Sequence, residues 1–260
     1  MHAAERERMI LEAMQPTGFV SYRDLEALLD ASPATIRRDL SRLEDAGQIV
    51  RVHGGANLVE GTEGARLTPL HLAGTPFDQA ITLNLAAKRA IGRAAAKLCL
   101  PGEGVMIDGG TTTLQMCSHL AGLDCQVLTN SLHIVNALLP QSGTHILIPS
   151  GTVFREQNII LAASGEESMP RFHAPKLFMG AAAIGPQGVM QADVVLVAAE
   201  RRLIDRAEEV ILLVDSSKFR SQSGTIVCGL DEIDTVITDA LPPAMAEVLH
   251  QAGVRVLIAG

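Results

Sequence analysis

The sequence predicts an α/β protein, with a small N-terminal winged helix-turn-helix and a larger C-terminal domain built on a doubly wound, mostly parallel sheet. Three helical patterns and a β-prone segment occupy the first 59 residues, and short apolar strands then alternate with helical segments. The core must be aliphatic, because the 260 residues include no Trp and one Tyr. We expect domains over residues 1–59 and 79–260. Residues 60–78, with several Gly and Pro and no periodicity, are expected to form a linker.

Composition restricts the class of protein. The formal charge of −8 confines any nucleic-acid contact to a local surface, because a purely electrostatic binder is normally basic. The four cysteines form no C-x-x-C pair and the eight histidines are scattered, so we expect no disulfide framework, metal or cofactor and a reducing, cytoplasmic location. The charged N-terminus predicts no signal peptide, and no apolar stretch is long enough to span a membrane.

Three helices are predicted in the first domain. Residues 4–15 form the first, and the second begins at residues 21–24, where Ser and an acidic residue resemble a capping box. The third has Ser32 as its cap, Pro33 in its first turn and Gly47 after its end. The apolar residues expected to face the core of this domain are Ile10, Ala13, Met14, Leu25, Leu28, Leu29, Ile36, Leu40 and Leu43.

A β-hairpin is predicted directly after the third helix. Residues 48–55 are β-prone and end in a Gly-Gly turn, and residues 56–59 follow as a second short strand. Such a hairpin is the wing of a winged helix-turn-helix. Residues 32–53 carry a net charge of only +1, so the prediction of DNA contact depends on where the arginines lie. The alternative is that they only solvate a helix face. The arginines on the third helix and the wing are Arg37, Arg38, Arg42 and Arg51.

These segments carry a family resemblance. The letters SPATIRRDL at residues 32–40 and RVHGGA at residues 51–56 closely resemble the N-terminal signature of DeoR-type regulators, the deoxyribose-operon-repressor family. The resemblance implies that the third helix enters the major groove of double-stranded DNA, with its first residues near the base edges and its arginines on phosphates or guanines. Asp39 is expected to orient an arginine. The predicted DNA-binding residues are Ser21, Tyr22, Pro33, Ala34, Thr35, Arg37, Arg38, Arg42, Arg51 and His53.

The second domain is predicted as a series of strands separated mostly by helices. A helix from residue 79 to about residue 98 comes first, and its expected buried residues are Ile81, Leu85, Ile91, Ala95 and Leu98. The predicted strands are residues 105–107, 126–128, 145–148, 176–179, 210–214, 235–237 and 254–258.

Small, hydroxyl-bearing or charged residues follow five of these strands. Ligands of such sheets bind beyond the carboxyl ends of the strands. Residues 108–113 open a helix whose N–H groups and hydroxyls could hold an anion, and Lys218 could face it. Alternatively, residues 108–113 only cap a helix and Lys218 is an ordinary surface lysine. The predicted effector-binding residues are Asp108, Gly110, Thr111, Thr112, Thr113, Thr129, Asn130, Ser131, Gly151, Gly180, Glu200, Asp215 and Lys218.

The resemblance to DeoR-type regulators extends into this domain. The letters DGGTTT, TNS and DSSK after three of the strands look like the sensor domain of that family, which is similar in fold to ribose-5-phosphate isomerase. The resemblance implies a phosphorylated sugar, sugar acid or polyol as effector, with its phosphate at residues 110–113 near residues 129–131 and Lys218. Ser150–Gly151 departs from the Gly-Gly that the family often has, which leaves the backbone conformation there open.

The fold kinship raises the alternative of a sugar-phosphate isomerase-like enzyme that carries a DNA-binding arm. The related isomerase has an acidic D-G-A-D-E run where residues 179–183 read MGAAA, so the acids are missing here. Glu200 stands at the position of the base, or it is only a surface charge beside Arg201 and Arg202. We expect no enzyme and no catalytic residue. The predicted function is a transcriptional regulator, acting as a homo-oligomer of at least two copies on repeated or palindromic operator half-sites.

Overall fold

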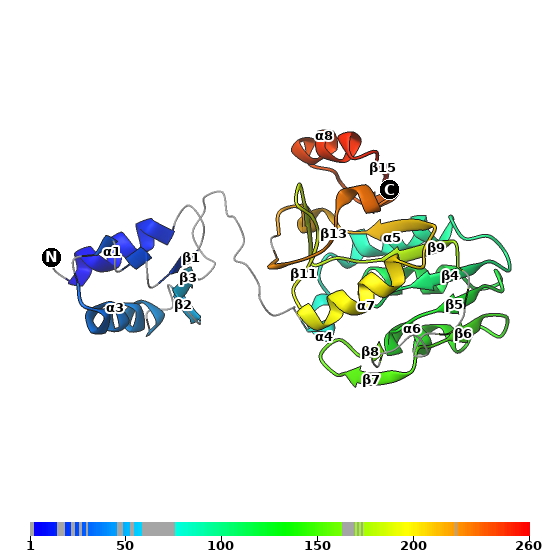
Figure 1. Cartoon of the computed structure of the whole chain (residues 1–260), viewed down its shortest axis with the longest axis horizontal. Coiled ribbons are helices and arrows are strands. Elements are labelled where there is room, and N and C mark those ends of the chain that lie inside the picture. Colours follow the sequence, from blue (N-terminus) through cyan, green and yellow to red (C-terminus); the bar gives the residue numbers. More distant parts are fainter. Residues whose placement is uncertain are drawn as a thin grey trace. The chain divides into compact units, whose positions relative to one another are not determined.

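The computed structural model of the protein describes residues 3–14, 19–21, 24–25, 28–29, 31–45, 49–52, 55–58, 76–162, 170, 172, 174–221 and 223–260. The chain divides into two compact units, Met1–Leu70 and His71–Gly260 (Figure 1). Most of the predicted linker lies outside the described residues, and its last two residues, Phe77 and Asp78, begin a helix of the second unit. Within the described ranges, no helix has the length and apolar character needed to cross a membrane.

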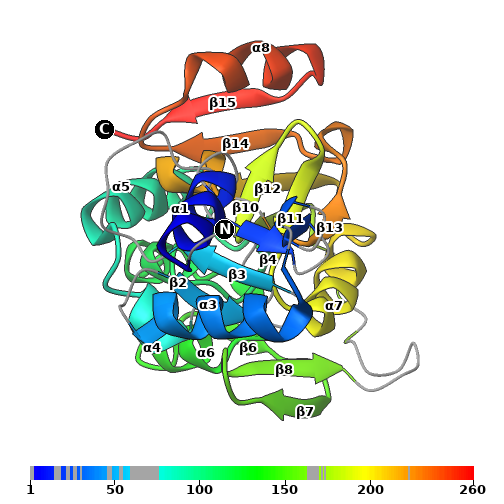
Figure 2. The same ribbon diagram turned by 90° about the vertical axis from the view of Figure 1, so that its left-hand side faces the viewer.

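The first unit has the first and third predicted helices and the predicted hairpin, whereas much of the second predicted helix lies outside the described residues and β1 was not predicted. Helix α3 lies alongside a small antiparallel sheet of order β1-β3-β2 (Figure 2). The hairpin of β2 and β3 pairs Ile49 with Leu58 and Val52 with Gly55, so the predicted wing is present. The bounds of the elements are α1 (Ala3–Met14), β1 (Phe19–Ser21), α3 (Pro33–Asp45), β2 (Ile49–Val52) and β3 (Gly55–Leu58).

The aliphatic core of the first unit follows the predicted stripes with one exception. Ile36, Leu40 and Leu43 of α3 are buried, as are Leu25 and Leu29. Leu28 is 45% exposed, so the prediction that it belongs to the core was wrong. Leu25 and Leu29 are four residues apart and therefore lie on the same inward face, whereas Leu28 points away from it.

The second unit contains a parallel sheet of seven strands in the order β15-β14-β12-β9-β4-β5-β6. All seven were predicted from the sequence. The first half of its elements is α4 (Phe77–Ala80), α5 (Leu85–Ala96), β4 (Gly104–Ile107), η1 (Thr113–His119), β5 (Gln126–Leu128), α6 (Leu132–Leu138), β6 (His145–Leu147), β7 (Gly151–Phe154) and β8 (Ile159–Ala162). The second half is β9 (Lys176–Met179), β10 (Ala183–Gly185), β11 (Gly188–Gln191), α7 (Val194–Ile204), β12 (Glu209–Leu213), η3 (Ser216–Phe219), β13 (Thr225–Cys228), η4 (Leu230–Glu232), β14 (Thr235–Thr238), α8 (Pro243–Gln251) and β15 (Arg255–Ile258).

The sheet is covered on both faces, as the doubly wound prediction requires. Met106 on β4 packs in a cluster with residues of α7 and α8, while its neighbours Val105 and Ile107 pack in a second cluster with α5, η1 and α6. Figure 2 shows α5 and α7 on opposite sides of the sheet. The chain runs outward from β4 through β5 to β6 and then returns to β9 on the other side of β4. The switch point of the sheet therefore lies between β4 and β9, which is where ligands of such folds bind.

Two features of the second unit differ from the prediction. The single helix expected over residues 79–98 is split into α4 and α5 by a turn that ends at Asn84, which has φ = 52°. Asn tolerates this left-handed backbone better than most residues, so the helix breaks there. Ile81, Leu85 and Leu98, which were expected to be buried, are only partly buried. The antiparallel sheet β10-β11-β13 and the hairpin of β7 and β8 were not predicted.

Candidate functional site

The exposed face of α3 carries most of the predicted DNA-binding residues. Ser32 Oγ accepts a hydrogen bond from the backbone N–H of Thr35 (3.3 Å), so Ser32 caps the helix and Pro33 is its first residue, as predicted. Pro33, Ala34, Arg37 and Arg38 are exposed, whereas Thr35 is partly buried and its hydroxyl lies 2.9 Å from Ser32 Oγ. Within the described residues, the side chains of Arg37 and Arg38 have no hydrogen bond or ion pair.

Arg42 differs from these two arginines because it has partners inside the unit. Its Nε donates to Glu7 Oε1 (2.6 Å) and its Nη2 donates to Asp39 Oδ1. Asp39 is fully buried, and its Oδ2 also accepts from Arg6 Nε (2.6 Å). The buried carboxylate therefore joins α1 to α3 and orients Arg42, which agrees with the expectation for Asp39.

The structure gives less for the remaining predicted DNA-binding residues. Tyr22 and His53 lie outside the described residues. Ser21 ends β1, and Arg51 lies in β2 opposite Ala56 of β3. The backbone of Arg51 therefore belongs to the wing, as predicted.

In the second unit, the predicted site residues gather at the carboxyl ends of the parallel strands. Asp108 follows β4 and Asn130 follows the adjacent β5. Asn130 Nδ2 donates to Asp108 Oδ1 (2.9 Å), and Asn130 Oδ1 accepts from the backbone N–H of Gly109 (3.1 Å). The side chain of Asn130 thus ties together the two loops that were expected to surround the anion.

Several hydroxyls in these loops have local structural roles. Thr113 Oγ1 donates to the carbonyls of Asp108 (2.8 Å) and Gly110 (3.0 Å), and Ser131 Oγ caps α6 by accepting from Ile134 N (3.4 Å). Thr129 Oγ1 accepts from Ser131 N (3.2 Å). Ser131 therefore caps a helix, whereas Thr113 bonds to carbonyls of its own loop, and Thr112, the N-cap of η1, makes no side-chain cap bond. The more accessible part of the first loop is its start, because residues 109–111 are only partly buried.

A second lysine, Lys88, lies within electrostatic range of Lys218 and was not among the predicted site residues. Lys88 on α5 is 3% exposed, and its Nζ donates to the carbonyl of Ala80 (2.6 Å). Burial lowers the pKa of Lys88, the charge of Asp215 raises it, and the charge of Lys218 lowers it, so the two lysines and this carboxylate share one electrostatic environment. The available signal was the helical stripe, because Lys88 lies one turn from Ile91 on the buried face of α5.

The carboxylate between these lysines is itself tightly held. Asp215 follows β12, is buried, and its Oδ1 accepts from the backbone N–H of Ser217 (3.1 Å), from Ser217 Oγ (2.5 Å) and from Asn84 Nδ2 (2.9 Å). Lys218 is partly buried in the short η3 helix that follows. The polar network of this loop fixes the position from which Lys218 projects.

Two buried carboxyl groups lie within electrostatic range of each other near the switch point. Glu200 on α7 is 4% exposed, so the alternative that it is a surface charge was wrong; Arg201 pairs instead with Asp205 and Glu232. Burial and the charge of Asp108 raise the pKa of Glu200 well above its usual value. Its Oε1 accepts from Gln191 Nε2 (2.5 Å), whereas its Oε2 has no hydrogen-bond partner within the described residues.

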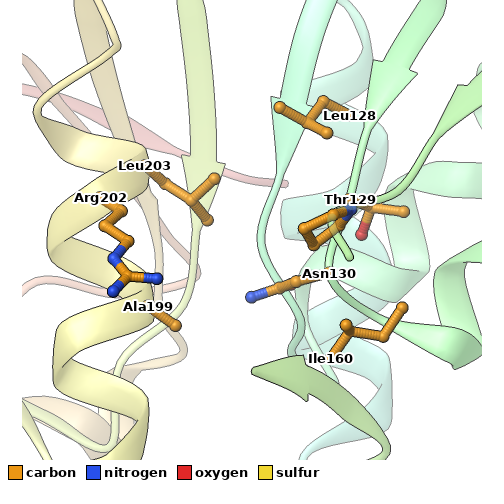
Figure 3. Close-up of a pocket in the computed structure, with 8 residues that line it drawn as sticks. Leu128, Thr129, Asn130, Ile160, Ala199, Arg202 and Leu203 are labelled. Carbon is orange, nitrogen blue, oxygen red and sulfur yellow. The ribbon is translucent and has the colours of Figure 1, made fainter. Parts of the chain in front are cut away.

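Space is available at the end of the central strand. Gly180 follows β9, which lies between β4 and β12, and a Cβ added to Gly180 would meet no atom within 4 Å. A small hollow beside Asn130 is lined by Leu128, Thr129, Asn130, Pro149, Ile160, Ala199, Arg202 and Leu203. Figure 3 shows Arg202 and Asn130 extending toward each other across it. Gly151 lies exposed in β7 and does not line this hollow.

Comparison with known proteins identifies the family. Residues 6–62 match the DeoR-like helix-turn-helix domain, and residues 83–240 match the DeoR C terminal sensor domain. The second match alone covers more than half of the chain. The chain belongs to the DeoR family. The first unit is therefore a DNA-binding domain of this family, the second is its sensor domain, and the protein is a transcriptional regulator.

Relatives of similar length support this placement in the DeoR family. The chain is 33% identical to a protein of Escherichia coli O157:H7 provisionally named an aga operon transcriptional repressor, with 99% of this chain and 94% of the relative covered. It is 31% identical to the HTH-type transcriptional repressor GlcR of Bacillus subtilis (strain 168), with 99% and 97% covered. It is 30% identical to the HTH-type transcriptional regulator UlaR of Escherichia coli O1:K1 / APEC, with 99% of each covered. All three are named as regulators, in agreement with the prediction that the chain is not an enzyme.

Solved structures resemble this DeoR-family chain only distantly. Ribose 5-phosphate isomerase A from Methanocaldococcus jannaschii has a TM-score of 0.38 at 15% identity, over 52% of this chain and 55% of that chain. The probable sor operon regulator from Shigella flexneri has a TM-score of 0.40 at 10% identity, over 64% and 90%.

Proposed function

We propose that this DeoR-family regulator is a cytoplasmic repressor that releases its operator when a phosphorylated sugar, sugar acid or polyol binds the carboxyl ends of strands β4, β5, β9 and β12. Two of the three relatives are named transcriptional repressors, which supports repression as the sign of control. The protein acts as a homo-oligomer of at least two copies, because a symmetric dimer reads two operator half-sites.

The exposed face of α3 is the part of the first unit that reads DNA in this proposal. Pro33, Ala34 and Thr35 lie in the first turn, where a recognition helix approaches base edges. Arg37 and Arg38 contact phosphates or guanines, and Arg42, already held by Glu7 and Asp39, contacts DNA from a fixed position. Ser21 of β1 and Arg51 of the wing also belong to the proposed interface, together with Tyr22 and His53.

The observation that carries the effector proposal is the pair of lysines around Asp215. An ammonium group has three N–H donors, and Lys88 uses one of them on Ala80 O. Asp215 supplies one negative charge to these two cations, so one positive charge is left for a further anion to pair. A phosphate held by Lys88, Lys218 and the backbone at residues 109–111 would be that anion, and Thr111 and Thr112 would flank it.

The carboxyl groups near the switch point favour a hydroxylated compound as the rest of the effector. Sugar and polyol hydroxyls both donate and accept hydrogen bonds, so they suit Asp108 and the unpartnered oxygen of Glu200. The open space over Gly180 lies between the ends of β4 and β12, which carry Asp108 and Asp215. An isomerase is disfavoured, because residues 179–183 have no acidic side chain to act as a base.

A melting-temperature screen tests the effector site. The panel is inorganic phosphate, glucose-6-phosphate, 6-phosphogluconate, sorbitol-6-phosphate and their unphosphorylated counterparts. A compound that binds only the folded state raises the melting temperature. We expect shifts from phosphorylated members, and smaller shifts in Lys218→Ala. Equal responses to phosphorylated and unphosphorylated members, or turnover of a sugar phosphate, would overturn the proposal.

The DNA assignment is tested by operator retardation with two matched arginine variants. Arg38→Ala removes an exposed arginine of α3, and we expect at least a tenfold loss of affinity for duplex DNA from upstream of the gene. Arg8→Ala removes an exposed arginine of α1 that pairs with Glu12, and it should bind DNA within about twofold of wild type. Wild-type affinity of Arg38→Ala would refute the assignment.

A further inference from the structure

The four-residue helix α4 is tied to the proposed effector site at three separate points. It is the first described element after β3, and the chain reaches it directly from the segment that follows the DNA-binding unit. A helix this short is not stable by itself in water, because nucleation of a helix is unfavourable. The position of α4 therefore depends on the contacts that hold it.

The first contact is made by the buried lysine of the proposed phosphate site. Lys88 Nζ donates to the carbonyl of Ala80, the last residue of α4 (2.6 Å). The same ammonium group faces the charges of Asp215 and Lys218. An anion that binds the Lys88 ammonium group therefore acts on the donor that holds the carbonyl at the end of α4.

The second contact comes from the turn that follows α4. Asn84 Nδ2 donates to Asp215 Oδ1 (2.9 Å) and to Ser217 Oγ (3.3 Å). Residues 215–217 lead directly to Lys218, so a change in this loop on effector binding changes the acceptors of Asn84. Asn84 and Asp215 are 131 residues apart in the sequence.

The third contact reaches the loop after β5. Phe77 of α4 is buried, and its ring stacks on His133 of α6 with ring centroids 3.8 Å apart and an interplanar angle of 8°. His133 follows Ser131, the cap of α6, by two residues. Its Nε2 lies 3.0 Å from Asn158 Nδ2, and Asn158 O accepts from Leu132 N (3.0 Å). The first residue of α4 thus packs on the helix that begins at the proposed effector loop.

We propose that α4 and its following turn are the element through which effector binding changes DNA affinity. The inference rests on the proposed function. Lys88 and α6 contact α4 itself, and the loop at the end of β12 contacts the turn that follows it. When the effector occupies the site, these contacts change and α4 shifts. Phe77 and Asn84 are coupling residues, which act without contacting the effector or the DNA.

Two coupling variants and one matched control test this inference on the full chain. Asn84→Gly removes the amide and keeps a residue that tolerates the left-handed backbone. Phe77→Leu removes the stacked ring and keeps an apolar side chain. Thr82→Ala is the control, because Thr82 lies in the same turn and its hydroxyl donates only to Gln79 O (2.9 Å) among the described residues.

Each protein is measured in two assays, with the panel member that most raises the wild-type melting temperature and with inorganic phosphate. The first assay is the melting shift, which reports effector binding. The second is the loss of affinity for upstream DNA that the added compound causes. We expect this loss to be about 5- to 150-fold in wild type and Thr82→Ala. Both coupling variants should keep the melting shift. Their affinity for upstream DNA should fall by less than about twofold when the compound is added.

The outcomes separate the two proposals. Wild-type release of DNA by Asn84→Gly and Phe77→Leu would overturn the inference alone. Loss of the melting shift in Asn84→Gly would also overturn it, because the residue would then belong to effector binding. If wild type responds to no panel member in either assay, the proposed function fails and the inference fails with it. If Phe77→Leu does not melt cooperatively, Asn84→Gly decides the question.

Discussion

Replacement of Asp108 by Asn should change how the stability of the protein depends on pH. Burial raises the pKa of Asp108 from 3.8 to about 6, and hydrogen bonds from Asn130 and from the backbone of Gly109 lower it only in part. Asn has the same shape and keeps an oxygen that can accept from Asn130 Nδ2. The variant therefore removes the ionisation with little change in packing.

The size of the effect follows from this shift. A difference of about two pKa units corresponds to about 3 kcal/mol. Below about pH 4 the group is protonated in both the folded and the unfolded state. Between about pH 4 and pH 6 only the unfolded state loses the proton, so the free energy of unfolding falls as the pH rises through this window and stays lower above it. Asp108→Asn lacks this loss and should be more stable than wild type by up to about 3 kcal/mol at neutral pH.

Urea denaturation followed by circular dichroism measures this difference. The free energies of unfolding of Asp108→Asn and wild type are compared at several values between about pH 4 and pH 7, and the gap should widen as the pH rises. Asp231→Asn, which replaces an exposed carboxylate, is the control and should give a profile parallel to wild type. A constant gap for Asp108→Asn would refute the reasoning from burial.

Three further predictions concern other parts of the chain. Asp39→Ala should lower the free energy of unfolding of the first unit by about 1–3 kcal/mol, because Arg6 and Arg42 lose a shared buried acceptor; an unchanged calorimetric transition would contradict this. Gly180→Val should fold normally, since its side chain enters open space, but should blunt the melting shift with phosphorylated compounds; a full shift would mean that the effector does not use this space. Burial raises the pKa of three thiols to about 12, so native protein should resist iodoacetamide and unfolded protein should react, and rapid native alkylation would count against their burial. These thiols are Cys99, Cys117 and Cys228.

The sequence predicted the parallel sheet well because its strands are short apolar runs bounded by turn residues. All seven strands were placed to within one residue, and the cap at Ser32 was placed correctly, because Ser followed by Pro is a strong start signal for a helix. Because the carboxyl ends of parallel strands meet at one edge of the sheet, the sequence predicted that Asp108 and Asn130 lie close together, and the two side chains share a hydrogen bond.

Features that depend on long-range packing were not predictable in this way. The helical stripe of α5 could have placed Lys88 on the buried face, but no local pattern shows that Ala80, Asp215 and Lys218 interact with it. Strand β13 pairs with β11 across more than thirty residues of chain, and β10, β11 and β13 lack a regular alternation of polar and apolar residues. The break at Asn84 is stabilised by its bond to Asp215, a residue far away in the sequence.

The central claim is that a phosphorylated compound controls the affinity of this repressor for DNA. The most direct test is to measure the affinity for upstream duplex DNA by fluorescence anisotropy, with and without the phosphorylated compound that binds best. Wild type should bind this DNA in preference to unrelated DNA and lose about 5- to 150-fold in affinity when the compound is added. Lys218→Ala should bind the DNA as wild type does and keep that affinity with the compound present. Equal affinity for any DNA sequence, or DNA binding by wild type that no phosphorylated compound alters, would contradict the account.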